Sequence, residues 1–321
     1  MDSALRRIRI AVSTGRLRGL PAEPGTPEIT LLGAGESYVA WRIGSGDQAR
    51  VLRVPRRSPH EMPRSMTAEF ETLRRVPPEL GTSAIALETG TDNPLGIPYM
   101  VTTHVSGRAL RATDWNPRLA TALAHQIARL HEAFATSPAP SAVFVPSAGE
   151  QGEELLTWWG RHHPETLTDP RVTALLPAWR RELTRLAPAF EAVPIHPLIH
   201  GDVVVTNVIL GPDGVPRLID FEWSGPGDRA KDLALIGGRV IGGPWYLPMT
   251  PDDVAAFVTE YSRHSCHAGA IDPQRLLERR DAYELLDRMG NLLYCLSRPG
   301  EARYGMWADE IARNLTDRLA D

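Results

Sequence analysis

The chain has almost no lysine, few cysteines and no long apolar segment. Its basic residues are arginines apart from Lys231, and the net charge of −4 leaves no basic stripe for nucleic acid. Cys266 and Cys295 lie far apart without the His and Cys neighbours of a zinc site, which favours free thiols in a reducing compartment. No run of about 18 apolar residues could span a membrane, and the Arg-rich start lacks a signal peptide's apolar run. We expect a cytoplasmic protein without nucleic-acid or membrane partners.

Three polar residues stand out in the segment 198–233. Asp202 and Asn207 lie five residues apart after an apolar run, and Asp220 ends a second apolar run. The GPDG sequence at 211–214 is a turn signal between the runs. The pattern therefore predicts a hairpin that presents polar groups at its ends.

These residue types suit phosphoryl transfer from a nucleoside triphosphate. Such a reaction needs Mg²⁺ held by hard oxygen ligands and a group that aims the attacking hydroxyl. Asn207 and Asp220 are the predicted metal ligands, and Asp202 is predicted to orient the hydroxyl. The alternative is that Asp202 caps a helix and Asp220 sits in a turn. The order and spacing favour a kinase that uses ATP or GTP.

The same segment resembles the aminoglycoside phosphotransferase family, the small-molecule relatives of protein kinases. The resemblance is carried by four motifs: His200-Gly201-Asp202, Asn207, Asp220-Phe221-Glu222 and Asp232-Leu233-Ala234. It implies that Asp202 is catalytic, that Asn207 and Asp220 bind Mg²⁺, that Asp232 braces the loop and that His200 supports it. Asp232 could instead cap a helix beginning at Leu233. The interior of the loop, 203–206, departs from the family pattern because it is mostly valine.

The resemblance also implies the fold. We expect an α+β, bilobal protein-kinase-like fold with two domains. The N-terminal nucleotide-binding lobe, 1–105, would hold an antiparallel sheet and one helix. The C-terminal lobe, 106–321, would be mostly helical and would carry catalysis and substrate binding.

A flexible turn near residue 35 is the first predicted nucleotide-binding element. It connects expected strands at 28–32 and 38–43, and it contains Gly33, Gly35 and Ser37. Glycines in such a turn let backbone N–H groups approach phosphates closely. Most glycine pairs of this kind are plain hairpin turns, so the turn alone is weak evidence.

The next strand predicts a cation for the phosphates. Alternation in 48–55 puts Val51 and Arg53 on one face, which in the kinase arrangement looks at the nucleotide. Lys231 lies elsewhere, so Arg53 must replace the usual lysine, and its fork suits phosphate. Glu69, beside the apolar stripe of a helix near 66–74, is the predicted partner carboxylate. Arg53 on a solvated strand and Glu69 on an exposed helix face are the alternatives.

The expected strand 96–105 leads to the predicted hinge at Thr103, His104 and Val105. Backbone groups there would bind the base, so the preference for ATP or GTP is left open. Apolar periodicity beyond the hinge predicts helices, and 137–152 is predicted to be a loop. The predicted helices are 118–134, 153–160, 177–190, 251–264, 273–296 and 301–319.

The acceptor is the least constrained part of the prediction. Acidic residues such as Glu150, Glu153 and Glu154 suit a polyamine, whereas aromatic residues such as Trp245 and Trp307 suit a sugar or macrocycle face. The VLRVPRR run resembles macrolide kinases, which commonly have His where this chain has Asn207. The prediction is a hydroxylated small molecule, an antibiotic first. A kinase of a protein or of a housekeeping metabolite such as choline, and a pseudokinase scaffold, are the alternatives.

Overall fold

The computed structural model describes residues 2–20, 28–138, 144–265 and 272–320, so Cys266 lies outside the described residues. The chain forms two compact units. Unit 1 comprises residues 1–108 and 217–224, and unit 2 comprises residues 109–216 and 225–321. Asp220 therefore belongs to unit 1, whereas Asn207 belongs to unit 2.

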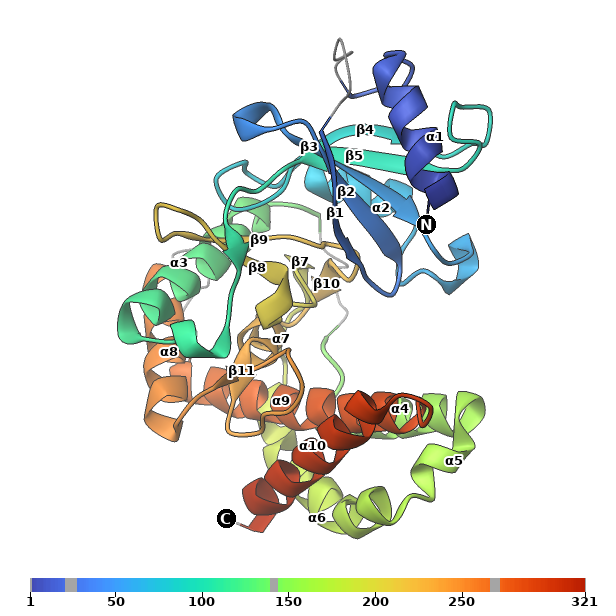
Figure 1. Cartoon of the computed structure of the whole chain (residues 1–321). Helices are drawn as coiled ribbons and strands as arrows, with labels where there is room; N and C mark the ends of the chain where they lie inside the picture. Colours follow the sequence, from blue (N-terminus) through green and yellow to red (C-terminus); the bar gives the residue numbers. More distant parts are fainter. Residues whose placement is uncertain (1, 21–27, 139–143, 266–271, 321) are drawn as a thin grey trace. The chain divides into compact units, whose positions relative to one another are not determined.

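Unit 1 is built on an antiparallel sheet (Figure 1). Its strands run in the order β1-β2-β3-β5-β4. The predicted sheet and the predicted helix after its third strand are both confirmed. The elements are β1 (Ile29–Ala34), β2 (Tyr38–Ile43), β3 (Arg50–Pro55), α2 (Met66–Leu73), β4 (Ala84–Glu88) and β5 (Tyr99–Thr103).

An N-terminal helix, α1 (Asp2–Ser13), completes unit 1 and was not predicted. Ile8, Ala11 and Val12 are buried in one cluster with sheet residues such as Leu52 and Val101. The spacing of three and four residues gives α1 an apolar face, whereas Arg6, Arg7 and Arg9 are exposed. The arginines between the apolar positions lower the mean hydropathy of this segment, so its apolar stripe did not predict a helix.

The segment 217–224 joins unit 1 through backbone contacts. Leu218 donates its N–H to Leu80 O at 2.8 Å and accepts from Thr82 N at 3.2 Å. A Cβ at Gly81 would lie 2.1 Å from Leu218 O, so this approach requires glycine. The contact fixes the backbone just before Asp220.

Unit 2 is mainly helical. The helices at 118–134, 251–264, 273–296 and 301–319 are confirmed within a residue or two. The helices are α3 (Pro117–Phe134), α4 (Ala148–His162), α5 (Pro164–Leu167), α6 (Pro170–Leu186), α7 (Arg229–Leu235), α8 (Pro251–His264), α9 (Pro273–Leu296) and α10 (Ala302–Ala320).

Two boundary predictions in unit 2 were wrong, and so was the alternative that Asp232 caps a helix. The predicted loop 137–152 ends early, because Ser147 forms a capping box with Glu150 and α4 begins at Ala148. The helix predicted to begin at Pro177 begins at Pro170. Its buried apolar face includes Val172 and Leu175 before the proline and continues with Trp179 after it, so the helix runs through Pro177. Helix α7 is capped by Asp228 rather than by Asp232.

Short strands position the segment that carries Asp202. Strand β7 (His196–Ile199) pairs antiparallel with β10 (Gly225–Gly227), and β11 (Gly237–Gly238) pairs parallel with β12 (Leu247–Pro248). The predicted turn at 211–214 is confirmed, since Gly211 donates to Val215 O at 3.0 Å. The remaining strands are β6 (Arg108–Ala109), β8 (Val208–Leu210) and β9 (Pro216–Leu218), and short 3₁₀ helices lie at 46–48, 59–61, 112–114, 187–190 and 205–207. Within the described ranges, no helix has the length and apolar character that a membrane crossing requires.

Candidate active site

In unit 1, Arg53 connects two of the carboxylates that the sequence singled out. Its guanidinium pairs with Glu69 on α2 and donates to Asp220 Oδ1 at 2.6 Å. Arg53 and Glu69 are buried, whereas the Asp220 side chain is 36% exposed. The alternatives of a solvated Arg53 and an exposed Glu69 are therefore wrong. A buried arginine bound to a partly exposed carboxylate leaves a charged group facing solvent.

Tyr38, which the sequence analysis did not single out, stabilises this group. Its hydroxyl donates to Glu69 Oε2 at 3.1 Å, and its ring lies 4.1 Å from the Arg53 guanidinium carbon. Burial would lower the pKa of Arg53, but the charges of Glu69 and Asp220 outweigh it and raise that pKa. Burial raises the pKa of Glu69 against the pull of Arg53. We take Glu69 to be ionised, because an arginine beside it stays charged at any relevant pH.

The backbone at Asp220 is unusual. Asp220 has φ 65°, in the left-handed region that a non-glycine residue rarely adopts. Arg53 holds its carboxylate on one side, and the Leu218 backbone bonds fix the chain before it. Strain of this kind costs of order 1–3 kcal/mol and persists where the surroundings impose it, often at functional sites.

Glu222 and Arg64 complete the polar cluster of unit 1. Burial and the nearby charge of Asp220 raise the pKa of Glu222 to about 7, and Glu222 Oε2 has no hydrogen-bond partner in the described part of the chain. Arg64 donates to the backbone oxygen of Ser224 and to its Oγ at 3.0 Å, which anchors the chain after Glu222. Arg64 lies in a loop without periodicity, so the sequence carried no signal for this role.

The predicted glycine turn lies at the end of the β1–β2 hairpin. Gly35 donates to Tyr38 O at 2.9 Å, and the register shifts between Leu31 and Gly33. A Cβ at Gly33 would meet nothing within 4 Å, and neither Gly33 nor Gly35 has a positive φ. Neither glycine is thus required by its own backbone conformation, and the space beside Gly33 is open. Ser37 is buried, and its hydroxyl lowers the pKa of the neighbouring Glu222 against the larger effect of burial, which raises it.

The remaining unit 1 predictions concern Val51 and the hinge. Val51 lies on β3 two residues before Arg53 and is partly buried. Thr103 donates its N–H to Ser83 O at 2.9 Å, and His104 donates its N–H to Ala49 O at 3.4 Å. Of the three predicted hinge residues, Val105 is the one whose N–H has no partner among the described residues. The Val105 N–H is therefore the one of these three that is left to bind a ligand.

In unit 2, Asp202 and Asn207 lie together as their spacing predicts. Asn207 Nδ2 donates to Asp202 Oδ2 at 2.7 Å and to Asp202 O at 3.1 Å. These bonds orient the amide so that Asn207 Oδ1 points away from Asp202 and can serve as a ligand oxygen. The valines at 203–205, which depart from the family pattern, are buried and anchor the loop by packing.

Asp232 braces the start of this loop, as the resemblance implied. Its carboxylate accepts from His200 N at 2.7 Å and Gly201 N at 2.8 Å, and it contacts His131 Nε2 at 2.9 Å. His131 in turn contacts Tyr261 Oη at 2.7 Å. Burial alone would raise the pKa of Asp232, but its bond to His131 and the charges of His131 and His200 hold it below the usual value. His131 lies in the last turn of α3, and the sequence carried no signal for this role.

The donor set suits Mg²⁺. Asp220 offers a partly exposed carboxylate and Asn207 an amide oxygen, the hard oxygen ligands that this ion prefers. The described residues contain no group of three or more His, Cys, Asp or Glu side chains arranged to hold a metal ion. The predicted ligands, Asn207 and Asp220, are an amide and a single carboxylate and so do not form such a group. Their role in binding Mg²⁺ stays a prediction.

Residues 28–283 match the model of the phosphotransferase enzyme family. The chain belongs to this family. The resemblance drawn from the four motifs is thereby confirmed, and the match covers most of the chain, including every predicted site residue. No curated protein matches the chain by sequence.

Solved structures show the fold of this family member. Choline kinase from Cryptosporidium parvum Iowa II is similar at 13% identity with a TM-score of 0.62, over 98% of this chain and 94% of that one. The GDP complex of aminoglycoside 2′-phosphotransferase-IIIa is similar at 17% identity with a TM-score of 0.62, over 100% and 99% of the two chains. Plasmodium vivax ethanolamine kinase is similar at 14% identity with a TM-score of 0.56, over 91% and 81%. The α+β kinase-like fold is confirmed.

Proposed function

We propose that this phosphotransferase moves the γ-phosphoryl group of ATP or GTP to a hydroxyl of a small molecule, an antibiotic first, in the cytoplasm. The observation that carries the proposal is the Asp202–Asn207 pair, held by Asp232 at the start of its loop. Asp202 accepts or orients the proton of the attacking hydroxyl. Asn207 and Asp220 would hold Mg²⁺, which neutralises charge on the phosphates when it is bound.

The residues of unit 1 would bind the nucleotide. Arg53, fixed by Glu69 and Tyr38, presents a charge that cannot be lost by deprotonation, which suits the α- and β-phosphates. The turn with Gly33, Gly35 and Ser37 offers backbone N–H groups to the phosphates, Val51 packs under the base, and the hinge binds its edge. Two solved structures that share the fold are complexes with GDP and with AMP-PNP, which supports a nucleotide donor.

One hollow on the surface of unit 2 bears on the acceptor. A hollow of about 550 Å³ on α4 is lined by three acidic residues, the half-exposed Trp158, Thr157 and the cationic Arg161. Glu150 there caps its own helix and Glu153 pairs with Arg180 at 2.7 Å, so Glu154 is the acid of this group that keeps its charge available. The hollow thus favours a hydroxylated acceptor with few ammonium groups.

A choline-like acceptor is the second candidate, because choline and ethanolamine kinases share the fold. A quaternary ammonium group needs open aromatic faces. The guanidinium carbon of Arg298 lies 3.5 Å from the centre of the Tyr294 ring, and that of Arg303 lies 4.9 Å from the Tyr304 ring centre. These two rings already have cations over their faces, so neither offers an open face to a choline ammonium group.

A panel experiment tests the proposal. The protein is incubated with Mg²⁺, ATP or GTP, and aminoglycosides, macrolides, choline or ethanolamine, and each acceptor is examined by mass spectrometry for the gain of one phosphate. The proposal expects an antibiotic to gain a phosphate with the wild type and not with Asp202→Asn. Phosphorylation of choline or ethanolamine alone would support the second candidate. A nucleotide-binding protein that modifies no acceptor and hydrolyses no nucleotide would be the pseudokinase scaffold.

A further inference from the structure

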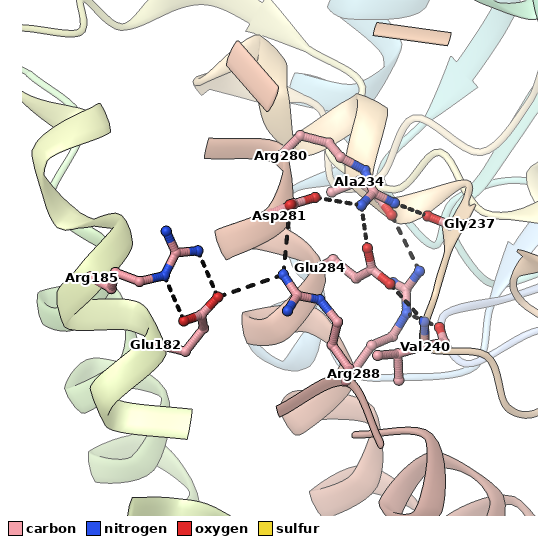
Figure 2. Close-up of polar contacts among 10 residues, drawn as sticks. Glu182, Arg185, Ala234, Gly237, Val240, Arg280, Asp281, Glu284 and Arg288 are labelled. Carbon is pink, nitrogen blue, oxygen red and sulfur yellow. Dashed lines mark hydrogen bonds and ion pairs between the residues drawn. The ribbon is translucent and has the colours of Figure 1, made fainter. Parts of the chain in front are cut away.

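Helix α9 buries three charged side chains on one face. Arg280, Glu284 and Arg288 are spaced four residues apart, and each is at most 2% exposed. Burial of charge is costly unless hydrogen bonds compensate for it. The partners of these three residues are mostly backbone groups of the segment 234–249, which begins at the end of α7 (Figure 2). The face therefore holds the segment that connects α7 to α8.

Arg280 and Glu284 hold the beginning of that segment. Arg280 donates to Gly237 O and pairs with Glu284, whose Oε1 accepts from Val240 N at 2.8 Å. A charge pair continues outward from Arg280 to Asp281 at 2.9 Å (Figure 2). Arg318 lies 3.6 Å from Asp281 and 3.6 Å from Glu182 on α6. This half of the network ties α9 to α6 and α10, and its bonds to the segment end at residue 240.

Arg288 contacts the segment at residues 234, 240 and 246. Its Nε donates to Val240 O at 2.9 Å, and a terminal nitrogen donates to Ala234 O at 3.3 Å near the end of α7. Its guanidinium carbon lies 3.4 Å from the centre of the Tyr246 ring, and it pairs with Asp287 at 2.5 Å. Tyr246 donates its hydroxyl to the same Asp287 carboxylate at 2.8 Å. Arg288 and Asp287 thus fix residue 246.

Residue 245 is bonded to the loop that carries Asp202. Val205 donates its N–H to Trp245 O at 2.8 Å. Within that loop, Val204 N donates to Asp202 O and Asn207 N donates to Val204 O, both at 2.9 Å, so a shift at 205 moves the whole turn. Burial, then the charge of Asp287, raises the pKa of Tyr246 well above its usual value, and Asp202 adds in the same direction. Tyr246 therefore keeps the proton that it donates.

We propose that Arg288 and Tyr246 are positioning residues, which set the place of Asp202 and Asn207 through the Trp245–Val205 bond. The proposal rests on the proposed function for its effect on turnover. It does not depend on that function for its effect on the loop itself. Asp232 fixes the loop at residues 200 and 201, and the α9 network fixes it at residue 205.

The variants are Tyr246→Phe, which removes the hydroxyl but keeps the ring over Arg288, and Arg288→Lys, which keeps charge but loses the fork. Arg280→Lys is the matched control, because it alters an equally buried arginine of α9 whose contacts do not reach residue 246. Thermal unfolding of each variant first shows that it folds. Amide hydrogen exchange in peptides covering residues 203–207 then reports on the loop without any substrate.

We expect amide exchange at 203–207 to become about tenfold faster in Tyr246→Phe and Arg288→Lys, with kcat about tenfold lower and the KM for nucleotide unchanged. Arg280→Lys should lower the unfolding temperature while leaving loop exchange and kcat within about twofold of wild type. Unchanged exchange in both variants, or an equal effect of Arg280→Lys, would overturn the proposal. If the wild type transfers no phosphate but the exchange pattern holds, the proposed function fails and the positioning role stands.

Discussion

The two buried arginine groups of this protein differ in what they leave open. Arg53 in unit 1 binds Glu69 and Asp220, and the group ends in a carboxylate that is 36% exposed on a strained backbone. Arg280, Glu284 and Arg288 in unit 2 bind backbone groups, each other and the neighbouring Asp281 and Asp287. The first arrangement has charge left for a ligand, whereas the second holds a loop. Burial of an ion pair alone does not distinguish a binding site from a structural support. A carboxylate that is still exposed to solvent, such as that of Asp220, does.

The largest expected effect tests the open end of the first group. Asp220→Asn keeps the size and the left-handed tendency of the residue but removes the charge. Loss of a metal ligand worth several kcal/mol corresponds to a fall in turnover of about 10³-fold. Steady-state kinetics at several Mg²⁺ concentrations would measure it. If turnover and its Mg²⁺ dependence match the wild type, Asp220 does not bind the metal.

The closed group should show its effect in stability. Arg280→Met leaves Glu284 buried with less compensation, and we expect a loss of about 3 kcal/mol in the free energy of unfolding. Arg185→Met is the control, because this exposed arginine pairs with Glu182 on the surface and should cost less than about 1 kcal/mol. Urea unfolding gives both values. Equal losses would mean that the α9 network contributes no more than a surface pair.

A pH effect should come from unit 2, beside the braced loop. Burial, and then the charge of His131, lowers the pKa of His196 to about 4. The unfolded chain binds this proton near pH 6.5, so the contribution of neutral His196 is full above that pH and is lost as the pH falls towards 4. We expect His196→Gln to reduce the acid loss of stability by on the order of 2 kcal/mol. Unfolding at pH 7.5 and 4.5 tests this; parallel losses in both proteins would contradict it.

Two glycines give the smallest and most local comparison. A Cβ at Gly238 would lie 2.3 Å from an Arg280 nitrogen and 2.4 Å from both Glu284 oxygens, so Gly238→Ala should cost about 2 kcal/mol. Gly33→Ala meets open space and should change stability by no more than about 0.5 kcal/mol. A rise in the KM for nucleotide in Gly33→Ala, at unchanged stability, would support a role for that turn in phosphate binding. A large stability loss there would show that the space is not open.

Much of the fold was predictable because its elements carry local signals. The sheet, α3, α8 and α9 follow from apolar periodicity and capping residues such as Asn116 and Thr250. Helix α1 was missed because its stripe is diluted by arginines, and the start of α6 because Pro177 looks like a boundary. These errors arise where tertiary packing outweighs a local signal.

The candidate site was predictable where short spacing fixes geometry. Asp202 and Asn207 share one turn, so their contact follows from the sequence. Tyr38, Arg64, His131 and Arg288 support the site from residues distant in sequence, and single tyrosines, arginines and histidines carry no sign of their partners. Such supports require coordinates, because their role depends on long-range contacts.

The most direct test of the account compares the wild type with Asp202→Asn. Nucleotide affinity is measured by calorimetry with Mg²⁺, and transfer of a labelled γ-phosphate is followed with the acceptor that the panel identifies. The account predicts that affinity stays within about twofold while transfer falls by about 10³-fold, because Asp202 orients the hydroxyl and does not hold the nucleotide. Transfer at the wild-type rate in Asp202→Asn would contradict it.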